Sequence, residues 1–216
     1  MSGTDWEAYY QKKSVVSVVT QHILFSKVAR ILSRVCTATY PEVCELGGGL
    51  TAFPKFLGRN ASVDFGRYVA IDTCEKALEL GAREYYSDDR ISFVKGNVTN
   101  DLHRRYGEFD VVLSFGLIEH FEREHQIHIV AEHLRLLRKN GIAIISFPTG
   151  TFQYRFVRAV MEFCNIWAFH DEVPLSLEEF HSLRPSSNVV YSKVLRRLPL
   201  TQMVVVLHRP DFENAH

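Results

Sequence analysis

The sequence predicts an α/β fold built on a mostly parallel sheet of seven strands, with helices on both faces. Between residues 43 and 147, nearly continuous apolar segments of strand length alternate with segments of helical periodicity, which is typical of parallel strands covered on both sides. Two further apolar segments near the end of the chain are separated only by Pro199-Leu200-Thr201. Because so short a link cannot cross a sheet, these two strands must pair antiparallel. The predicted sheet therefore ends in a C-terminal antiparallel hairpin.

Length and composition are those of an ordinary globular protein. The chain has 216 residues, 46% of them apolar and 23% charged, which suits a single domain with a sizeable core. Basic and acidic residues both number 25. The chain thus lacks the basic excess of nucleic-acid-binding proteins, and we expect no nucleic-acid partner.

Targeting signals are not evident. The first residues contain no basic and apolar signal sequence, and no uncharged run reaches the ~20 apolar residues of a membrane span. The four cysteines have no C-x-x-C or zinc spacing. We therefore expect no transmembrane segment and, by default, a reducing, cytoplasmic location.

Residues 1–40 precede the first predicted strand. Valine, isoleucine and leucine recur at helical spacing between Ser14 and Val35, which predicts one long helix or two shorter ones. Trp6, Tyr9 and Tyr10 stand ahead of this helix. Two interpretations remain open: a helix packed on the sheet edge, or an N-terminal helical lid whose aromatic residues close over a ligand.

The first strand ends in three consecutive glycines. Val43-Cys44-Glu45-Leu46 is followed by Gly47, Gly48 and Gly49, and glycines let a backbone take positive φ and approach a ligand closely. Such a turn at the carboxyl end of the first strand of an α/β sheet makes a ligand cradle. The second strand, Tyr68–Asp72, ends in an acid 23 residues after Gly49, near the ~20 expected for a carboxylate that binds a ribose. Together they predict a nucleoside ligand.

The remaining elements follow in order along the chain. We expect a crossover helix over Leu50–Leu57, a helix over Cys74–Leu80 ended by Gly81, and a strand over Ile91–Val94. A strand over Phe109–Phe115 is followed by a long amphipathic helix that Lys139-Asn140-Gly141 terminates. The last strands are Ile142–Phe147, Val189–Leu198 and Gln202–Leu207.

The Glu-x-Gly-x-Gly form of residues 45–49 resembles the first motif of the class I S-adenosylmethionine-dependent methyltransferases. Asp72 stands where their second motif ends, and Asn97 stands where their third usually has Asp. Ile118-Glu119-His120 and Leu137–Gly141 resemble segments of the small-molecule, type 11-like branch. The resemblance covers roughly residues 40–150 by motif and the rest by topology. It implies a Rossmann-like fold with a cofactor-binding core at 41–150, an acceptor-side insert at 151–187 and a hairpin at 188–209.

The resemblance also implies an activity: transfer of a methyl group from S-adenosylmethionine to a small-molecule acceptor at O, N or C, by in-line displacement. Such transfer needs proximity and alignment more than chemical assistance. His120 is the candidate general base, because histidine titrates near neutral pH; the alternative is a histidine that only caps or packs at a helix start. The implied cofactor-binding residues are Glu45, Gly47, Gly48, Gly49, Asp72, Thr73, Asn97, Val98, Ser114, Phe115 and Tyr10.

We expect no metal. Some methyltransferases of quinone pathways and RNA ends carry Glu-x-x-Glu-His after the fourth strand and bind a divalent ion there. This chain has Gly116 in the first ligand position, followed by Glu119 and His120. Two protein ligands are too few to hold an ion firmly.

The acceptor pocket is assigned to the aromatic-rich segment Thr151–His170, which follows the fifth strand on the side where open α/β sheets bind ligands. We expect Tyr154, Arg155 and Trp167 to contact an apolar, aromatic or lipid-linked acceptor, with arginines available for an anionic group. An ordinary crossover helix that packs its aromatics on the sheet is the alternative.

Two other functions remain open at this stage. An NAD(P)-binding oxidoreductase would share the glycine turn and Asp72, but the dinucleotide pattern requires a third glycine where this chain has Ala52, and no Tyr-x-x-x-Lys pair follows the fourth strand. A non-catalytic, methyltransferase-like binding protein is the other alternative.

Overall fold

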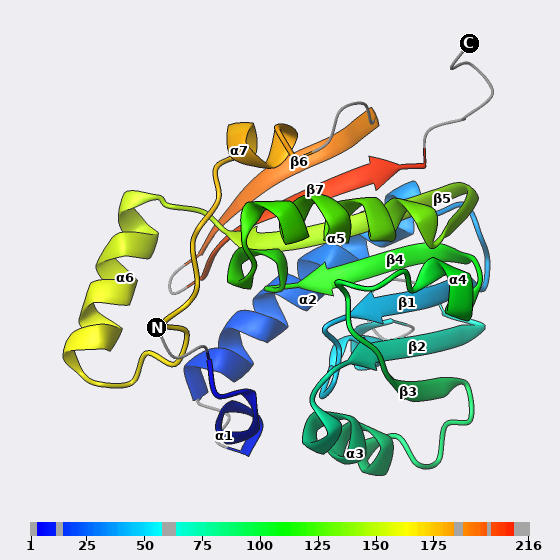
Figure 1. The fold of residues 1–216 in the computed structure, drawn as a ribbon, viewed down its shortest axis with the longest axis horizontal. Coiled ribbons are helices and arrows are strands. Elements are labelled where there is room, and N and C mark those ends of the chain that lie inside the picture. The colour runs from blue at the N-terminus through cyan, green and yellow to red at the C-terminus, as the bar shows by residue number, and fades with distance from the viewer. Residues whose placement is uncertain (1–3, 12–14, 58–63, 184–187, 198–199, 210–216) are drawn as a thin grey trace.

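A seven-stranded sheet forms the centre of the computed structural model (Figure 1), which describes residues 4–11, 15–57, 64–183, 188–197 and 200–209. The strand order is β3-β2-β1-β4-β5-β7-β6. The strands are β1 (Glu42–Leu46), β2 (Arg67–Asp72), β3 (Ile91–Lys95), β4 (Phe109–Phe115), β5 (Leu137–Pro148), β6 (Asn188–Arg197) and β7 (Leu200–His208).

Strand direction confirms the predicted fold class. β1 to β5 pair parallel with one another, so that Glu45 lies between Ala70 of β2 and Leu113 of β4. β7 pairs antiparallel with both β5 and β6. The result is a Rossmann-like, mostly parallel sheet with a C-terminal antiparallel hairpin.

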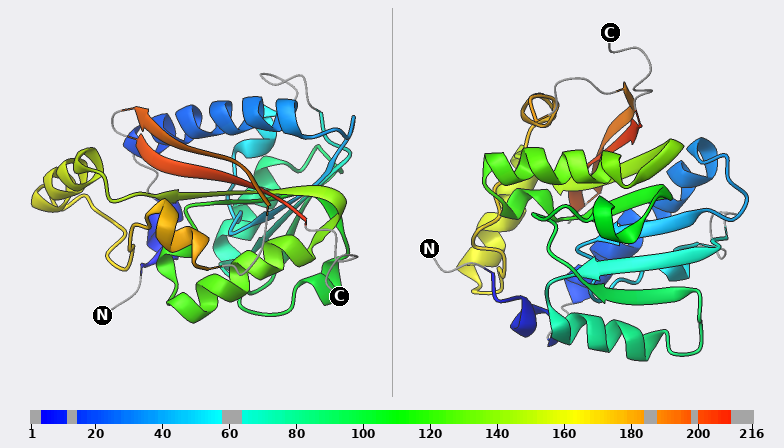
Figure 2. Two further views of the ribbon diagram at one scale, coloured as in Figure 1. Left: turned by 90° about the horizontal axis from the view of Figure 1, so that it is seen from above. Right: turned by 45° about the vertical axis from the view of Figure 1, so that its right-hand side comes forward.

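Helices cover both faces of the sheet, as alternation along each strand requires. In β1, Cys44 and Leu46 face the core under α5, whereas Val43 faces the core under α2. The view from above in Figure 2 shows α2 and α5 on opposite sides of the sheet. The helices are α1 (Trp6–Gln11), α2 (Val15–Val35), α3 (Glu75–Glu84), α4 (His103–Tyr106), α5 (Arg123–Arg135), α6 (Phe152–Phe163) and α7 (Leu177–His181), with short 3-10 turns η1 (Phe53–Phe56) and η2 (Ile118–His120).

The connection after β1 differs from the prediction. Instead of a helix over Leu50–Leu57, only η1 forms. Pro54 stands at the start of η1 and has no N–H to donate, and the Thr51 hydroxyl accepts from the Phe53 N–H at 3.0 Å. These local contacts favour a tight turn over a full helix.

Gly81 does not end the helix after β2, contrary to prediction. α3 continues to Glu84, and Gly81 is one of its buried residues. A Cβ on Gly81 would lie 2.3 Å from Cε1 of Phe93 and 2.6 Å from the Gly49 carbonyl oxygen. The glycine therefore serves close packing of α3 on β3 and on the glycine turn.

The predicted helix end at Lys139-Asn140-Gly141 is also wrong. α5 ends at Arg135 and β5 already begins at Leu137. The pairing with β4 jumps from Phe109↔Leu137 to Val111↔Ile142, so β5 carries extra residues at that point. Asn140 has φ +64°, a value that asparagine tolerates better than most residues, which fits the irregularity inside the strand.

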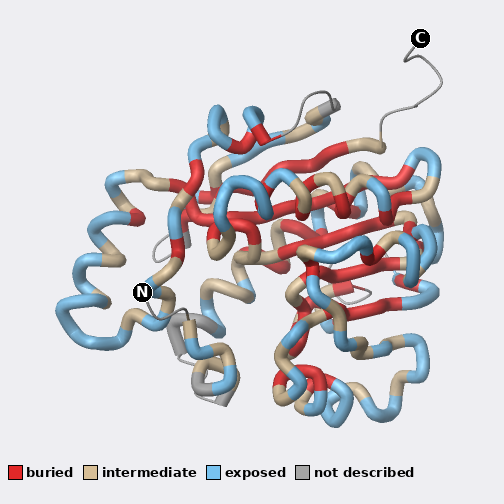
Figure 3. Tube along the Cα trace, viewed as in Figure 1, coloured by how far each residue is buried: buried red, intermediate tan, exposed pale blue. Residues whose placement is uncertain are grey.

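Beyond β5 the chain leaves the sheet. In Figure 3 the strands are largely buried while α6 is mostly exposed, and Tyr154 is the one buried residue of α6. α7 begins with the predicted capping box, in which Ser176 and Glu179 exchange side-chain and backbone hydrogen bonds. Among the described helices, none is long and apolar enough to cross a membrane.

Candidate functional site

A cavity of about 600 Å³ opens at the carboxyl edge of the sheet, within the usual size range of small-molecule sites. Figure 1 shows the arrowheads of β1, β2 and β4 directed toward the side where α1 and α6 lie. Segments that follow β1, β2, β3, β4 and β5 form one wall, and α1, the start of α2, and α6 with the segment after it form the other.

The glycine turn lies in the wall as predicted. Gly47 has φ +76°, and the N–H groups of Gly47 and Gly48 donate to the Ile71 carbonyl at 2.8 and 3.3 Å. A Cβ on Gly48 would lie 2.9 Å from the carboxyl carbon of Glu45. The turn therefore presents backbone to the cavity and leaves room for a ligand.

Glu45 lies buried beside this turn. Its carboxylate accepts from the Tyr68 hydroxyl and interacts with Thr51. Burial raises the pKa of Glu45 to about 7, against the lowering effect of these hydrogen bonds. A positively charged ligand group next to Glu45 would favour its ionised form.

Asp72 is held by the turn. Its two oxygens accept from the backbone N–H groups of Gly49 and Cys74, each at 2.9 Å. Each carboxylate oxygen has a further acceptor site, and Asp72 lines the cavity. Gly49 itself is not part of the wall; its role in this structure is to orient Asp72.

The residues predicted to contact adenine lie at the cavity. Asn97 and buried Val98 line the cavity, as do Thr73 and Tyr10. The Asn97 side-chain oxygen, however, already accepts from the Thr99 N–H at 3.0 Å and from the Thr99 hydroxyl at 2.9 Å. Only the Asn97 amide NH₂ is left to face a base.

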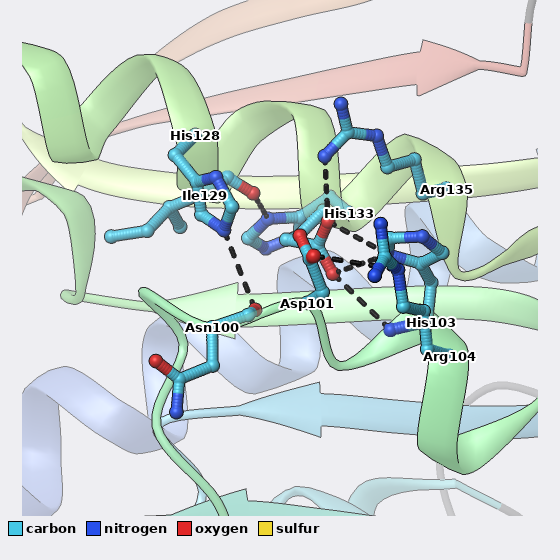
Figure 4. Close-up of polar contacts among 9 residues, drawn as sticks. Asn100, Asp101, His103, Arg104, His128, Ile129, His133 and Arg135 are labelled. Carbon is cyan, nitrogen blue, oxygen red and sulfur yellow. Dashed lines mark hydrogen bonds and ion pairs between the residues drawn. The ribbon is translucent and has the colours of Figure 1, made fainter.

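Phe115 lines the cavity, but Ser114 does not. The buried Ser114 hydroxyl lies 3.0 Å from Nε2 of His133, whose Nδ1 lies 2.7 Å from the Ile129 carbonyl. Figure 4 shows the contact between His133 and Ile129 on α5, beside the polar contacts of His103 and Arg135. Side chains alternate along β4, so that Ser114 points under α5 when Phe115 points to the cavity.

Next to His133 in the sequence of α5 stands a fully buried carboxylate, Glu132. It accepts from His103 at 2.9 Å and from Arg135 at 2.9 Å. Asp101, His103 and Glu132 lie close enough together to hold a metal ion. Because Glu132 is already paired with two cationic or hydrogen-bonding partners, we interpret this cluster as structural.

Above the glycine turn, a second acidic group faces the cavity. Glu119 and His120 come from η2, and Asp171 and Glu172 come from the segment before α7. Nδ1 of His120 lies 3.2 Å from Asp171, and the Val173 N–H donates to the Glu119 carbonyl at 3.0 Å, which joins the two segments. Burial lowers the pKa of His120, against the opposing charge of Asp171, so His120 is neutral near pH 7 and able to accept a proton.

Sequence reasoning missed Asp171 and Glu172. The two acids directly follow the aromatic segment, and this adjacency was the available signal. The expectation of metal independence rested on Glu119 and His120 alone, whereas the structure brings potential ligand atoms of Glu119, His120 and Glu172 within 4.8 Å of one another.

Aromatic rings from both ends of the chain meet beside His120. The centroid of Trp6 lies 5.0 Å from that of His120 and 6.1 Å from that of Phe169. Trp167 lies 5.8 Å from Phe169 and 6.2 Å from Tyr154. The segment before α2 and the segment after β5 thus share one aromatic wall.

Of the three predicted acceptor residues, the structure brings Tyr154 and Trp167 to the cavity but not Arg155. Arg155 is exposed and donates to the Gly150 carbonyl at 3.1 Å. Tyr154 lies on the buried side of α6. Arg155 is the next residue along the helix, so its side chain points away from that side. Phe152 and Phe163 are also outside, 86% and 90% exposed.

Comparison with known proteins shows what this core resembles. The sequence profile of a methyltransferase domain matches residues 44–145. An uncharacterised protein of Rickettsia prowazekii is 28% identical over 124 residues, which are 56% of this chain and 47% of that protein. The chain therefore spans about half the length of this curated relative.

Solved structures share the fold over nearly the whole chain. A magnesium protoporphyrin IX methyltransferase from Synechocystis with bound S-adenosylhomocysteine superposes with a TM-score of 0.70, at 13% identity, over 95% of this chain and 93% of that one. An S-adenosylmethionine-dependent methyltransferase from Anabaena variabilis superposes with a TM-score of 0.69, at 16% identity, over 96% and 97%.

Proposed function

We propose that this chain is a class I S-adenosylmethionine-dependent methyltransferase, as its domain match and its fold support, and that it transfers a methyl group from S-adenosylmethionine to a small-molecule acceptor. The observation that carries the proposal is the wall in which Gly47, Gly48, Glu45 and Asp72 adjoin one cavity. A backbone turn free of side chains beside two carboxylates suits a ligand that has an amine, a ribose and a close-fitting chain.

The residues present fit this cofactor. Glu45, Gly47 and Gly48 would hold its methionine end, and Asp72 would accept from the ribose hydroxyls with its remaining lone pairs. The Asn97 amide and Val98 would contact the adenine edge, with Thr73, Tyr10 and Phe115 nearby. When bound, the cofactor supplies a methyl group already activated by a sulfonium.

The protein's own contribution is position and exclusion of water. Holding the reactants in the right orientation can lower the activation barrier by ~7–11 kcal/mol. The aromatic wall keeps the transfer site apolar. The neutral imidazole of His120 lies at the junction of this wall with the acids, where it can accept an acceptor's proton. We propose that α1 and the first turns of α2 act as a lid, since they line the outer side of the cavity.

The state of the thiols supports a proposal about the compartment. The four cysteines are free, and Cys164 is exposed. Exposed thiols persist in reducing compartments, so we propose a cytoplasmic enzyme.

The activity is tested by incubating the protein with methyl-labelled S-adenosylmethionine and a metabolite extract. We expect label in a small molecule and, at limiting S-adenosylmethionine, about ten- to hundredfold less label with the Asp72→Ala variant. Binding of S-adenosylhomocysteine without any transfer would instead indicate a non-catalytic binding protein, and failure to bind it would contradict the proposal altogether.

A further inference from the structure

We propose that the methyl acceptor is an organic amine, and that Glu119, Glu172 and His120 form the subsite that binds its ammonium group. The inference deepens the proposed function and rests on it. It names the chemical class of the acceptor, which neither the fold nor the domain match specifies.

The first argument is the charge of the cavity. Five carboxylates line it, and among the described lining residues there is no lysine or arginine. Glu45 and Asp72 belong to the glycine turn and the cofactor side. Glu119, Asp171 and Glu172 remain on the opposite side, where an anionic acceptor would be repelled and a cationic one attracted.

The second argument is an unsatisfied buried oxygen. Glu119 is 1% exposed, and among the described residues its Oε2 has no hydrogen-bond partner. An unpaired carboxylate in such a place is costly unless a donor or a cation completes it. The cavity wall holds another unpaired acceptor, Oε1 of Gln202. Both oxygens would be satisfied by a ligand that donates hydrogen bonds. An ammonium group is such a donor, whereas a carboxylate or an ether oxygen is not.

The third argument is the arrangement of Glu172. This residue is 9% exposed, and one of its oxygens accepts from the Tyr154 hydroxyl at 2.5 Å, which fixes the carboxylate and leaves its second oxygen available. The charge of Arg158 lowers the pKa of Glu172, but the guanidinium donates to the Tyr154 hydroxyl and to the Glu172 backbone carbonyl, and Arg158 does not line the wall.

The distances suit a single nitrogen. One potential ligand atom from each of Glu119, His120 and Glu172 lies within 4.8 Å of the others, so an atom between them contacts all three. A divalent metal ion fits the same spacing. We favour an organic ammonium because Trp6 and Phe169 lie against His120, and aromatic faces attract alkylammonium groups through cation–π interaction.

The subsite also provides for the chemistry. An ammonium has no lone pair, so it must first give one proton to a carboxylate of the cluster or to His120. The neutral nitrogen then forms the N–C bond with the methyl carbon while the C–S bond breaks, and the bonding electrons stay on sulfur. The sulfonium becomes a neutral thioether, and the product is an N-methylammonium that the acids still balance.

Three probes of matched shape test this inference: benzylamine, benzyl alcohol and benzoate, each titrated into protein saturated with S-adenosylhomocysteine and followed by saturation-transfer NMR. We expect benzylamine to bind most tightly and benzoate least. In the double variant Glu119→Gln and Glu172→Gln, benzylamine affinity should fall about tenfold or more, with benzyl alcohol little changed. Glu124→Gln, at an exposed position of α5, is the matched control and should leave the affinities for all three probes unchanged.

The outcomes separate the two levels of the account. Failure of the unaltered protein to bind S-adenosylhomocysteine would overturn the proposed function. Retained S-adenosylhomocysteine binding with benzoate equal to or tighter than benzylamine, or benzylamine unaffected by the double variant, would overturn the amine subsite alone. A parallel titration with Mn²⁺ completes the test: tight binding that the double variant abolishes, without benzylamine binding, would identify a metal site instead.

Discussion

Burial sets the ionisation of individual carboxylates in the cavity. Burial raises the pKa of Glu45 and of Glu172 to about 7 each, and it raises the pKa of Glu119 well above its usual value, with Glu172 adding to the effect. Burial also raises the pKa of Asp72, and the backbone N–H groups from which Asp72 accepts hydrogen bonds oppose this effect. These acids are therefore poised to gain or lose protons near neutral pH when a cation arrives.

Asp72 gives the first prediction. Asp72→Asn keeps the shape but removes a charged acceptor, so affinity for S-adenosylhomocysteine should fall about ten- to hundredfold. Isothermal calorimetry measures this, and Asp88→Asn, at a half-buried turn position that does not line the cavity, serves as control. Equal affinities for wild type and Asp72→Asn would mean that Asp72 does not contact the nucleoside.

His133 gives a prediction about pH. Burial lowers the pKa of His133 to about 4, below the ~6.5 of an unfolded histidine. The unfolded chain thus binds the proton first as pH falls, and stability that is complete above about pH 6.5 is lost toward pH 4. Between pH 7 and pH 5 the wild type should lose about 2 kcal/mol relative to His133→Gln. Urea unfolding of both proteins at the two pH values measures the difference, and parallel pH curves would contradict it.

Single residues were predictable where a local motif fixes them. Glu45 and the glycines belong to one strand and the turn after it, and Asp72 ends the neighbouring strand. The structure places all of them together. Glu172 was not predictable, because only the folded chain brings it to Glu119, which is 53 positions earlier. Arg155 lies outside the cavity, because one helical position separates the buried side of α6 from the exposed side.

At the scale of elements, the position of α3 depends on the absence of a side chain at Gly81. Gly81→Ala would place a methyl group 2.3 Å from Phe93 and 2.6 Å from the Gly49 carbonyl. Such overpacking typically costs about 1–3 kcal/mol, and the displaced glycine turn should also weaken S-adenosylhomocysteine binding. Chemical unfolding and calorimetry check both effects. Gly150→Ala, whose Cβ would meet only Pro174 at 3.8 Å, should change stability far less.

The contact of α1 with the acceptor side gives a further prediction. Trp6 packs on His120 and Phe169, so Trp6→Ala should reduce methyl transfer to an identified acceptor by roughly three- to tenfold. S-adenosylhomocysteine affinity should change less than transfer does. If both measurements fall together, α1 acts through the cofactor and not through the acceptor.

Element boundaries were the least predictable feature of the fold. Gly81 and Lys139-Asn140-Gly141 both look like helix ends in the sequence, yet one lies inside α3 and the other inside β5. In each case a tertiary contact decides: Phe93 and Gly49 against Gly81, and the pairing of β5 with β4. Local signals carry no information about these partners.

At the scale of the whole molecule, the topology of the sheet brings the residues of the candidate site together. The parallel strands β1 to β5 deliver the segments that follow them to one edge of the sheet, and the chain's first helix and the segment after β5 close over that edge. The alternation of strands and helices predicted this architecture, because it depends on periodicity and not on any one contact. The acidic, aromatic outer half of the cavity depends on long-range contacts and emerged only from the structure.

The central claim is that the glycine-turn wall binds the nucleoside and amino-acid parts of S-adenosylmethionine. The most direct measurement is calorimetric titration of the protein with S-adenosylhomocysteine and, separately, with NAD⁺. We predict one-site binding of S-adenosylhomocysteine that is at least tenfold tighter than binding of NAD⁺, the margin expected from one charge-assisted contact. Tighter binding of NAD⁺ would contradict the assignment and favour an oxidoreductase.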